Sequence, residues 1–230
     1  MGVALTLSAV VVAYNNVINR WPPFHSWPYV PVNLAFAGAL TGMVAATIEL
    51  SGADLGWRAD VGDAVLPLSV VAAFAIVVFT IAYSRHGHRI ADRRVAGMND
   101  VALAWYVLVR IPVGTAVTEE LLFRGALFAA WRAAGLENAE AALVASIAFG
   151  LWHISPTILG LRINDPAASR GKVRAAVAGA VVFTTLAGLV LTWLRIEGGS
   201  LLGPIVLHAG INSMGALAAV VAGRRSRFGA

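Results

Sequence analysis

The sequence contains no cysteine and few charged residues. Asp, Glu, Lys and Arg make up only 13% of its 230 residues, 59% are hydrophobic, and the mean hydropathy is +0.77. The absence of cysteine excludes disulfides, thiolate metal ligands and a cysteine nucleophile. A soluble domain of this length would carry about 25% charged residues. The chain has too little polar surface to cover a core in water, so lipid is its expected solvent.

The net charge of +5 does not indicate a nucleic-acid partner. The basic residues collect in short segments between apolar stretches, and no stripe of basic residues interleaved with aromatic residues is present. Recognition of nucleic acid requires a basic patch or stripe of that kind. We therefore expect the partners to include the lipid bilayer and no nucleic acid.

Seven apolar stretches approach the length of about 20 residues that a membrane-spanning helix needs. They lie at 2–19, 30–50, 64–84, 105–130, 138–161, 175–194 and 201–223. The first is the weakest, because it is short and ends in three asparagines, Asn15, Asn16 and Asn19. The predicted fold is all-α: a polytopic membrane helix bundle of about seven transmembrane helices, in one domain over 1–230.

The loops between these stretches differ in charge. Segments 85–100 and 162–174, with the tail after 223, hold eleven of the seventeen basic side chains, whereas segment 49–63 holds four acidic residues and one arginine. Loops rich in Lys and Arg face the cytoplasm. We therefore expect a multi-pass protein of the cell membrane, with its N-terminus outside and its C-terminus in the cytoplasm.

Several polar residues are expected to lie outside the spans. The longest loop is predicted at 155–174, where Pro156 and Pro166 interrupt the pattern. Arg110, close to the start of the fourth span, is expected to extend its side chain to the cytoplasmic interface. Three histidines fall in predicted loops and are expected to be solvated: His25, His86 and His88.

Three of the spans carry ionisable residues. Such groups cost about 2.5–3.5 kcal/mol each at the bilayer centre, so by default they are functional candidates. At about 1.5 Å of rise per residue, they fall in one layer near the middle of the membrane. This agreement in depth favours a single site. The ionisable residues are Glu119, Glu120 and Arg124 in the fourth span, His153 in the fifth and His208 in the seventh, where Asn212 adds a polar carboxamide.

Helical spacing separates the two glutamates. Glu120 and Arg124 are four residues apart and can pair on one helix face. Glu119 is turned about 100° from Glu120, as one step at 3.6 residues per turn requires. Glu119 is thus left without a cation on its own helix face, and it is the candidate for chemistry.

The other polar residues supply complementary groups. Phe149 lies one turn before His153 and can pack beside its imidazole, while His208 and Asn212 share a face of another helix. A carboxylate and an imidazole that share a water molecule can act as general base and then general acid. A second imidazole and a carboxamide can stabilise an oxyanion. The set suffices to hydrolyse a carbonyl compound without a serine or cysteine nucleophile.

Three motifs in this half of the chain resemble those of a known family. Glu119–Gly125, EELLFRG, resembles the EExxFRG motif of the CAAX prenyl endopeptidase type II family, which includes the bacteriocin-processing and self-immunity proteins (CPBP). Phe149–His153, FGLWH, resembles its FxxxH motif, and His208–Asn212, HAGIN, its HxxxN motif. Each motif alone is a weak signal. Three in the right order, each in its own span, are a strong one.

The resemblance implies an all-helical intramembrane protease. Glu119 and His153 would activate the water, and His208 with Asn212 would stabilise the tetrahedral oxyanion. Glu120 and Arg124 would hold the site in shape. The substrate would be a peptide or protein, lipidated or membrane-embedded, and C-terminal processing of the CAAX type is one form of the reaction. The resemblance implies no cofactor and no metal.

Three alternatives stay open at this point. A non-catalytic member of the family would bind a peptide as an immunity or scaffold protein, a reading that predicts decay at a motif position, and all positions are intact. A proton-coupled transporter would show internal repeats, and none is apparent. Zinc held by Glu119, His153 and His208 is a variant of the enzyme, because Zn²⁺ commonly takes three protein ligands and a water.

Overall fold

The computed structural model describes residues 1–21, 24 and 26–228, so the expectation for His25 lies outside the described residues. Within these residues, six helical segments are long and apolar enough to cross a membrane: Tyr29–Thr47, Val61–Tyr83, Asp100–Ala133, Asn138–Asn164, Arg170–Gly198 and Leu202–Arg225. A shorter apolar helix, α1 (Gly2–Ile18), precedes them. No strand occurs in the described part of the chain. The predicted polytopic helix bundle is confirmed.

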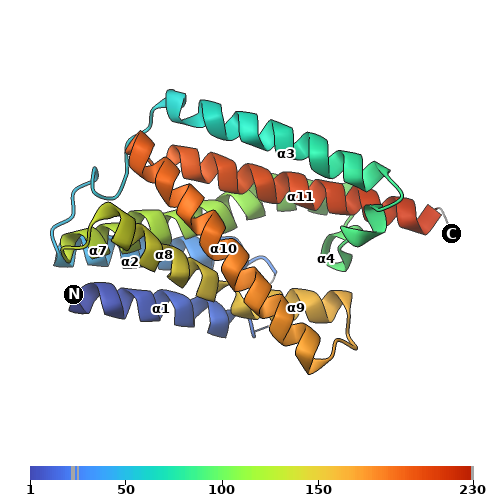
Figure 1. Ribbon diagram of the computed structural model, residues 1–230, viewed down its shortest axis with the longest axis horizontal. Coiled ribbons are helices and arrows are strands. Elements are labelled where there is room, and N and C mark those ends of the chain that lie inside the picture. Colours follow the sequence, from blue (N-terminus) through green and yellow to red (C-terminus); the bar gives the residue numbers. More distant parts are fainter. Residues whose placement is uncertain (22–23, 25, 229–230) are drawn as a thin grey trace.

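Most of the helices run back and forth roughly along the long axis of the molecule, and the helix labelled α10 crosses them obliquely (Figure 1). After α1 come α2 (Tyr29–Thr47), the short η2 (Val61–Ala64) and α3 (Val65–Tyr83). The single turns η3 (Gly87–Arg89) and α4 (Arg93–Ala96) lead to the fourth spanning segment. The last elements are α8 (Asn138–Trp152), α9 (Ile154–Asn164), α10 (Arg170–Gly198) and α11 (Leu202–Phe228). Helix α10 packs on α8, and α11 packs on α3.

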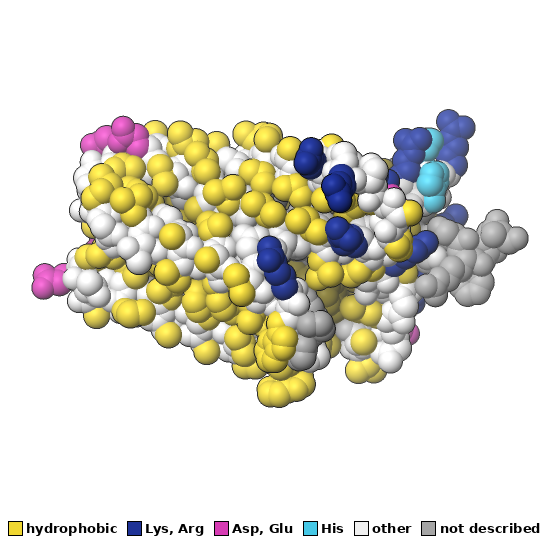
Figure 2. Space-filling model, turned by 90° about the horizontal axis from the view of Figure 1, so that it is seen from below, with side chains coloured by type: hydrophobic (Ala, Val, Ile, Leu, Met, Phe, Trp, Pro, Cys, Tyr) yellow, Lys and Arg dark blue, Asp and Glu magenta, His cyan; other side chains and the backbone are white. Residues whose placement is uncertain are grey.

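The two ends of the bundle differ in charge. The N-terminus and the connection between α2 and α3 lie at one end, and α4 and the C-terminal end of α11 lie at the other (Figure 1). Figure 2 shows acidic side chains at the first end and basic side chains in the half toward the second, with a broad hydrophobic surface along the bundle. His86 and His88, at the second end, are exposed as predicted.

The fourth spanning segment is one continuous helix with an unusual interior. It consists of α5 (Asp100–Trp105), η4 (Tyr106–Val117), α6 (Thr118–Glu120), η5 (Leu121–Leu127) and α7 (Phe128–Ala133), of which η4 and η5 are π-helical. Pro112 lies inside η4, and a proline there cannot make a regular helical hydrogen bond. π-Helical turns often mark functional sites. Here they flank the short α segment that carries both glutamates.

The prediction of a loop at 155–174 is wrong over most of that range. Helix α9 begins directly after a break at His153, and only 165–169 connect α9 to α10. Pro156 does not prevent this helix, because it lies in the first turn, where a backbone N–H has no intrahelical partner. The break leaves His153 between two helices, with φ −86° and ψ 3°.

Candidate active site

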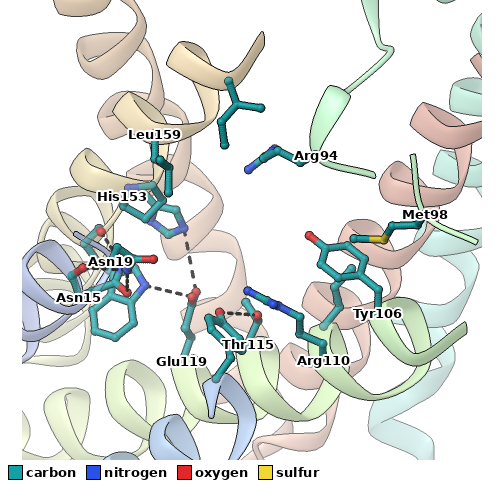
Figure 3. Close-up of a pocket in the computed structure, with 15 residues that line it drawn as sticks. Asn15, Asn19, Arg94, Met98, Tyr106, Arg110, Thr115, Glu119, His153 and Leu159 are labelled. Atoms are coloured by element: carbon teal, nitrogen blue, oxygen red, sulfur yellow. Dashed lines mark hydrogen bonds and ion pairs between the residues drawn. The ribbon is translucent and has the colours of Figure 1, made fainter. Parts of the chain in front are cut away.

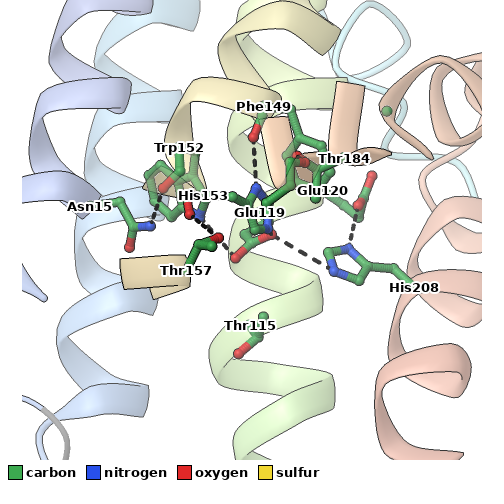
Figure 4. A network of polar contacts seen from close by, with 12 residues as sticks. Asn15, Thr115, Glu119, Glu120, Phe149, Trp152, His153, Thr157, Thr184 and His208 are labelled. Atoms are coloured by element: carbon green, nitrogen blue, oxygen red, sulfur yellow. Dashed lines mark hydrogen bonds and ion pairs between the residues drawn. The ribbon is translucent and has the colours of Figure 1, made fainter. Parts of the chain in front are cut away.

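Three polar side chains converge on the carboxylate of Glu119, which is buried in α6. The indole Nε1 of Trp152 donates to Oε1 at 3.0 Å. The other oxygen, Oε2, lies 3.7 Å from Nε2 of His208 and 4.0 Å from Nε2 of His153. Figure 4 shows these groups approaching from α6, α8 and α11. Oε2 makes no hydrogen bond with any described residue, so one carboxylate oxygen faces two imidazole nitrogens.

The second glutamate holds a separate set of contacts. Glu120 is fully buried, and its Oε1 accepts a hydrogen bond from Nη1 of Arg124 at 3.1 Å, which confirms their predicted pairing. The same Oε1 lies 2.7 Å from Nδ1 of His208. Nη2 of Arg124 donates to the carbonyl of Gly188 at 3.1 Å, and its guanidinium lies 4.3 Å from the ring centre of Phe149. His208 therefore bridges the two glutamates.

The ring of His153 is held by the last turn of α8. Nδ1 lies 2.7 Å from the carbonyl oxygen of Phe149, and a contact of this kind requires a proton on Nδ1. The neutral ring then presents the lone pair of Nε2 toward Glu119. The rings of Phe149 and His153 pack edge to face with centroids 4.7 Å apart, as the spacing of the two residues predicted.

A cavity of about 610 Å³ lies beside Glu119 and His153 (Figure 3). It extends toward the end of the bundle that carries α4, because Arg94 and Met98 also line it. Arg110 lines this cavity, its guanidinium 4.0 Å from the ring centre of Tyr29. The described residues that line it are Asn15, Asn19, Tyr29, Arg94, Met98, Tyr106, Arg110, Ile111, Thr115, Glu119, Trp152, His153, Pro156, Leu159 and Ile163.

This arrangement lies within the part of the chain that a family model recognises. The model of the Type II CAAX prenyl endopeptidase Rce1-like family matches residues 101–214. This part of the chain belongs to that family. At the level of the family, the protein is a CAAX-type intramembrane protease: a multi-pass membrane protein with a peptide substrate. No curated protein and no solved structure matches the chain.

One residue of the family motifs is not brought to the cluster. Asn212 is exposed on α11 and does not line the cavity, and its side chain makes no hydrogen bond with any described residue. The neighbouring Ser213 is buried instead and donates to the carbonyl of Val107 at 2.9 Å. The spacing correctly placed Asn212 one turn from His208. It did not reveal that only His208 reaches the glutamates of this CAAX-type protease.

Sequence reasoning missed the roles of Trp152 and of the first helix at the site, although it predicted that helix. Pro156 has no N–H to donate to the carbonyl of Trp152, and Nδ2 of Asn15 donates to that carbonyl at 2.8 Å instead. Pro156 and the asparagines of the first span were visible in the sequence. The sequence did not reveal that Asn15 contacts Trp152, which lies 137 residues further along the chain. The asparagines were attributed to the weak end of a span.

Asn16 replaces a second backbone hydrogen bond that is missing at this break. In a regular helix the N–H of Ser155 would donate to the carbonyl of Leu151. Here the N–H of Ser155 donates to Oδ1 of Asn16 at 2.8 Å, and Nδ2 of Asn16 donates to the carbonyl of Leu151 at 2.9 Å. The Asn16 carboxamide thus takes the place of one helical hydrogen bond across the break that carries His153.

Proposed function

We propose that this protein is an intramembrane endopeptidase in which Glu119 and His153 activate water without a metal. The observation that supports the proposal is the convergence of two imidazole nitrogens on one buried carboxylate oxygen at the edge of a cavity. Polar contacts longer than 3.5 Å are commonly bridged by water. We place the reacting water between Oε2 of Glu119 and Nε2 of His153.

The reaction follows from these positions. Glu119 accepts one proton from the water, whose other hydrogen is held by the lone pair on Nε2 of His153. The water oxygen bonds to the scissile carbonyl carbon, and the C=O electrons move onto the carbonyl oxygen. His208, with a proton on each ring nitrogen, donates one hydrogen bond from Nδ1 to Glu120 and another from Nε2 to this oxyanion. The C–N bond then breaks as Glu119 returns its proton to the leaving nitrogen. The products are a carboxylic acid and an amine.

Asn212 belongs to the proposal as the second oxyanion donor that the family resemblance implies. The matched comparison is Asn212→Ala against His208→Ala, with kcat and KM measured on one peptide. A similar fall in kcat for both variants would support the shared role. A normal kcat for Asn212→Ala would assign oxyanion stabilisation to His208 alone.

The experiment for the main proposal is cleavage of prenylated and unprenylated C-terminal peptides by the purified protein. Glu119→Gln is expected to lower kcat by about 10²–10⁴-fold, the usual contribution of a general base. Glu197→Gln, an exposed acid on α10, is the control. Cleavage by Glu119→Gln at the normal rate would refute the mechanism. Peptide binding without cleavage by the wild type would favour the non-catalytic immunity or scaffold function.

The same assay tests the zinc variant. Among the described residues, no group of three or more His, Asp or Glu side chains is placed to hold a metal ion. We expect a chelator to leave the cleavage rate unchanged. Loss of activity with chelator and its return with Zn²⁺ would assign Glu119, His153 and His208 as ligands instead.

We also propose that the basic end of the bundle faces the cytoplasm, which puts the N-terminus outside and the mouth of the cavity on the cytoplasmic side. The lack of cysteine allows a clean test. An impermeant maleimide added to intact cells is expected to label Arg58→Cys, at the acidic end, and not Arg170→Cys, at the basic end. The reverse pattern would invert the topology.

A further inference from the structure

The backbone between α8 and α9 lacks two hydrogen bonds that a continuous helix would make. The helix is interrupted at His153, and Pro156 has no N–H to donate to the carbonyl of Trp152. The N–H of Ser155, which would pair with the carbonyl of Leu151 in a regular helix, donates to a side chain of α1 instead. Backbone groups away from water are costly to leave unpaired. The break therefore depends on partners from another helix.

Two asparagines of α1 supply these partners. Nδ2 of Asn15 donates to the carbonyl of Trp152 at 2.8 Å. Oδ1 of Asn16 accepts from the N–H of Ser155 at 2.8 Å, and its Nδ2 donates to the carbonyl of Leu151 at 2.9 Å. A carboxamide carries both a donor and an acceptor, so one Asn16 side chain can replace both halves of a helical hydrogen bond.

Both asparagines are fixed by further contacts. Asn15 is buried, and its Oδ1 accepts a hydrogen bond from Nδ2 of Asn19 at 2.6 Å. The backbone carbonyl of Asn16 accepts from Oγ of Ser155 at 2.9 Å. These contacts orient each carboxamide toward the break.

The broken backbone carries two of the groups that face Glu119. Nε1 of Trp152 donates to its Oε1 at 3.0 Å, and Nε2 of His153 lies 4.0 Å from its Oε2. We infer that Asn15 and Asn16 are positioning residues, which hold the break open and thereby aim the indole and the imidazole at the carboxylate. This inference rests on the proposed function. Neither asparagine lies in the family-matched stretch 101–214.

The helix that carries Glu119 shows the same combination of a proline and a donor from another helix. In the π-helical η4, the carbonyl of Val107 would pair with an N–H five residues later, at Pro112, which has no N–H. Oγ of Ser213, on α11, donates to this carbonyl at 2.9 Å. In both helices a proline frees a carbonyl near the site, and a neighbouring helix provides the donor.

Asn16→Leu tests the inference without altering the wall of the cavity, because Asn16 is not among the described residues that line it. In this variant the N–H of Ser155 is free to pair with the carbonyl of Leu151, which closes the break and moves His153. We expect kcat to fall about ten- to a hundredfold, the scale of a misplacement near 1 Å. KM should stay unchanged, and the pH dependence of kcat should change.

Ser8→Ala is the matched control on the same helix. Oγ of Ser8 accepts from Nε1 of Trp131 at 3.2 Å, so this substitution loosens α1 far from the break. It is expected to lower Tm while kcat, measured well below that Tm, stays at the wild-type value. An equal fall in kcat for Ser8→Ala and Asn16→Leu would mean that α1 acts by packing alone, and would overturn the inference. A normal kcat for Asn16→Leu would also overturn it.

Asn15 is tested through Pro156. Asn15→Leu leaves the carbonyl of Trp152 without its donor and is expected to lower both Tm and kcat. Adding Pro156→Ala supplies an N–H that can donate to this carbonyl within a straight helix. The double variant is expected to regain Tm, whereas its kcat stays below that of Pro156→Ala alone, in which Asn15 still holds the break. Recovery of kcat to the Pro156→Ala value would overturn the role of Asn15.

The fluorescence of Trp152 gives a readout that needs no turnover. Its emission is the difference between a protein and the same protein with Trp152→Phe. We expect this difference spectrum to change in Asn16→Leu, because the indole leaves Oε1 of Glu119, and to match the wild type in Ser8→Ala. An unchanged spectrum in Asn16→Leu would overturn the inference whether or not any peptide is cleaved. A changed spectrum without cleavage by the wild type would count against the proposed protease function alone.

Discussion

Arg124→Met tests the buried core of the site. Arg124 is 1% exposed and Glu120 is fully buried, so this substitution removes the cation and leaves a buried carboxylate with His208 as its remaining polar neighbour. It also removes a hydrogen bond to the carbonyl of Gly188. Breaking a buried pair by removing one partner costs about 3–5 kcal/mol. For a protein of this size, about 2–4 °C of Tm is lost per kcal/mol, so we expect a loss of about 6 °C or more.

The assay is thermal unfolding of the purified protein in detergent, followed by the fluorescence of its seven tryptophans. Arg174→Met, at an exposed position on α10, is the matched control and should unfold at the wild-type Tm. Glu120→Gln combined with Arg124→Met removes both charges and is expected to be more stable than Arg124→Met alone. The reasoning is refuted by an Arg124→Met Tm within about 1 °C of the wild type, or by a double variant less stable than the single one.

Three further predictions follow from contacts around the site and the basic end. Trp152→Phe removes the donor to Oε1 of Glu119; we expect kcat to fall with little change in Tm, as measured by peptide cleavage and unfolding. Gly150→Ala would bring a Cβ within 2.8 Å of a backbone carbonyl on α10, and overpacking of this kind lowers stability by about 1–3 kcal/mol. Burial alone would raise the pKa of Asp92, but hydrogen bonds, led by those from Arg94, hold it below its ordinary value. A carboxyl with a lowered pKa stabilises the fold above its unfolded pKa of about 3.9 and loses this effect as pH falls through the folded pKa. The Tm advantage of the wild type over Asp92→Asn should therefore be full at neutral pH and disappear in acid.

Much of the fold could be predicted because length and apolar content are properties of each segment alone. The six long apolar segments and the shorter α1 correspond to the seven predicted stretches. Their ends were less predictable. α9 continues through 155–164, where prolines indicated a loop, because a proline in the first turn of a helix breaks no hydrogen bond.

The site was predicted where its contacts lie within one helix. The pairing of Glu120 with Arg124 and the packing of Phe149 on His153 follow from a spacing of four residues. Contacts between helices could not be read from spacing. Neither the contact of His208 with Glu120 nor the exposure of Asn212 has a signal in the sequence, because both depend on how α11 is rotated against its neighbours.

The cavity is built from two parts of the chain with different constraints. Glu119, His153 and His208 lie in the family-matched stretch 101–214, but a third of the cavity wall precedes it: Asn15, Asn19, Tyr29, Arg94 and Met98. Substitutions in that part of the cavity wall can change which peptide fits the cavity, without altering the side chains proposed to transfer the proton of the water. Homologous proteases can therefore differ in substrate specificity while they keep the same catalytic chemistry. A substrate found for one member is a poor guide to another unless its first two helices also correspond.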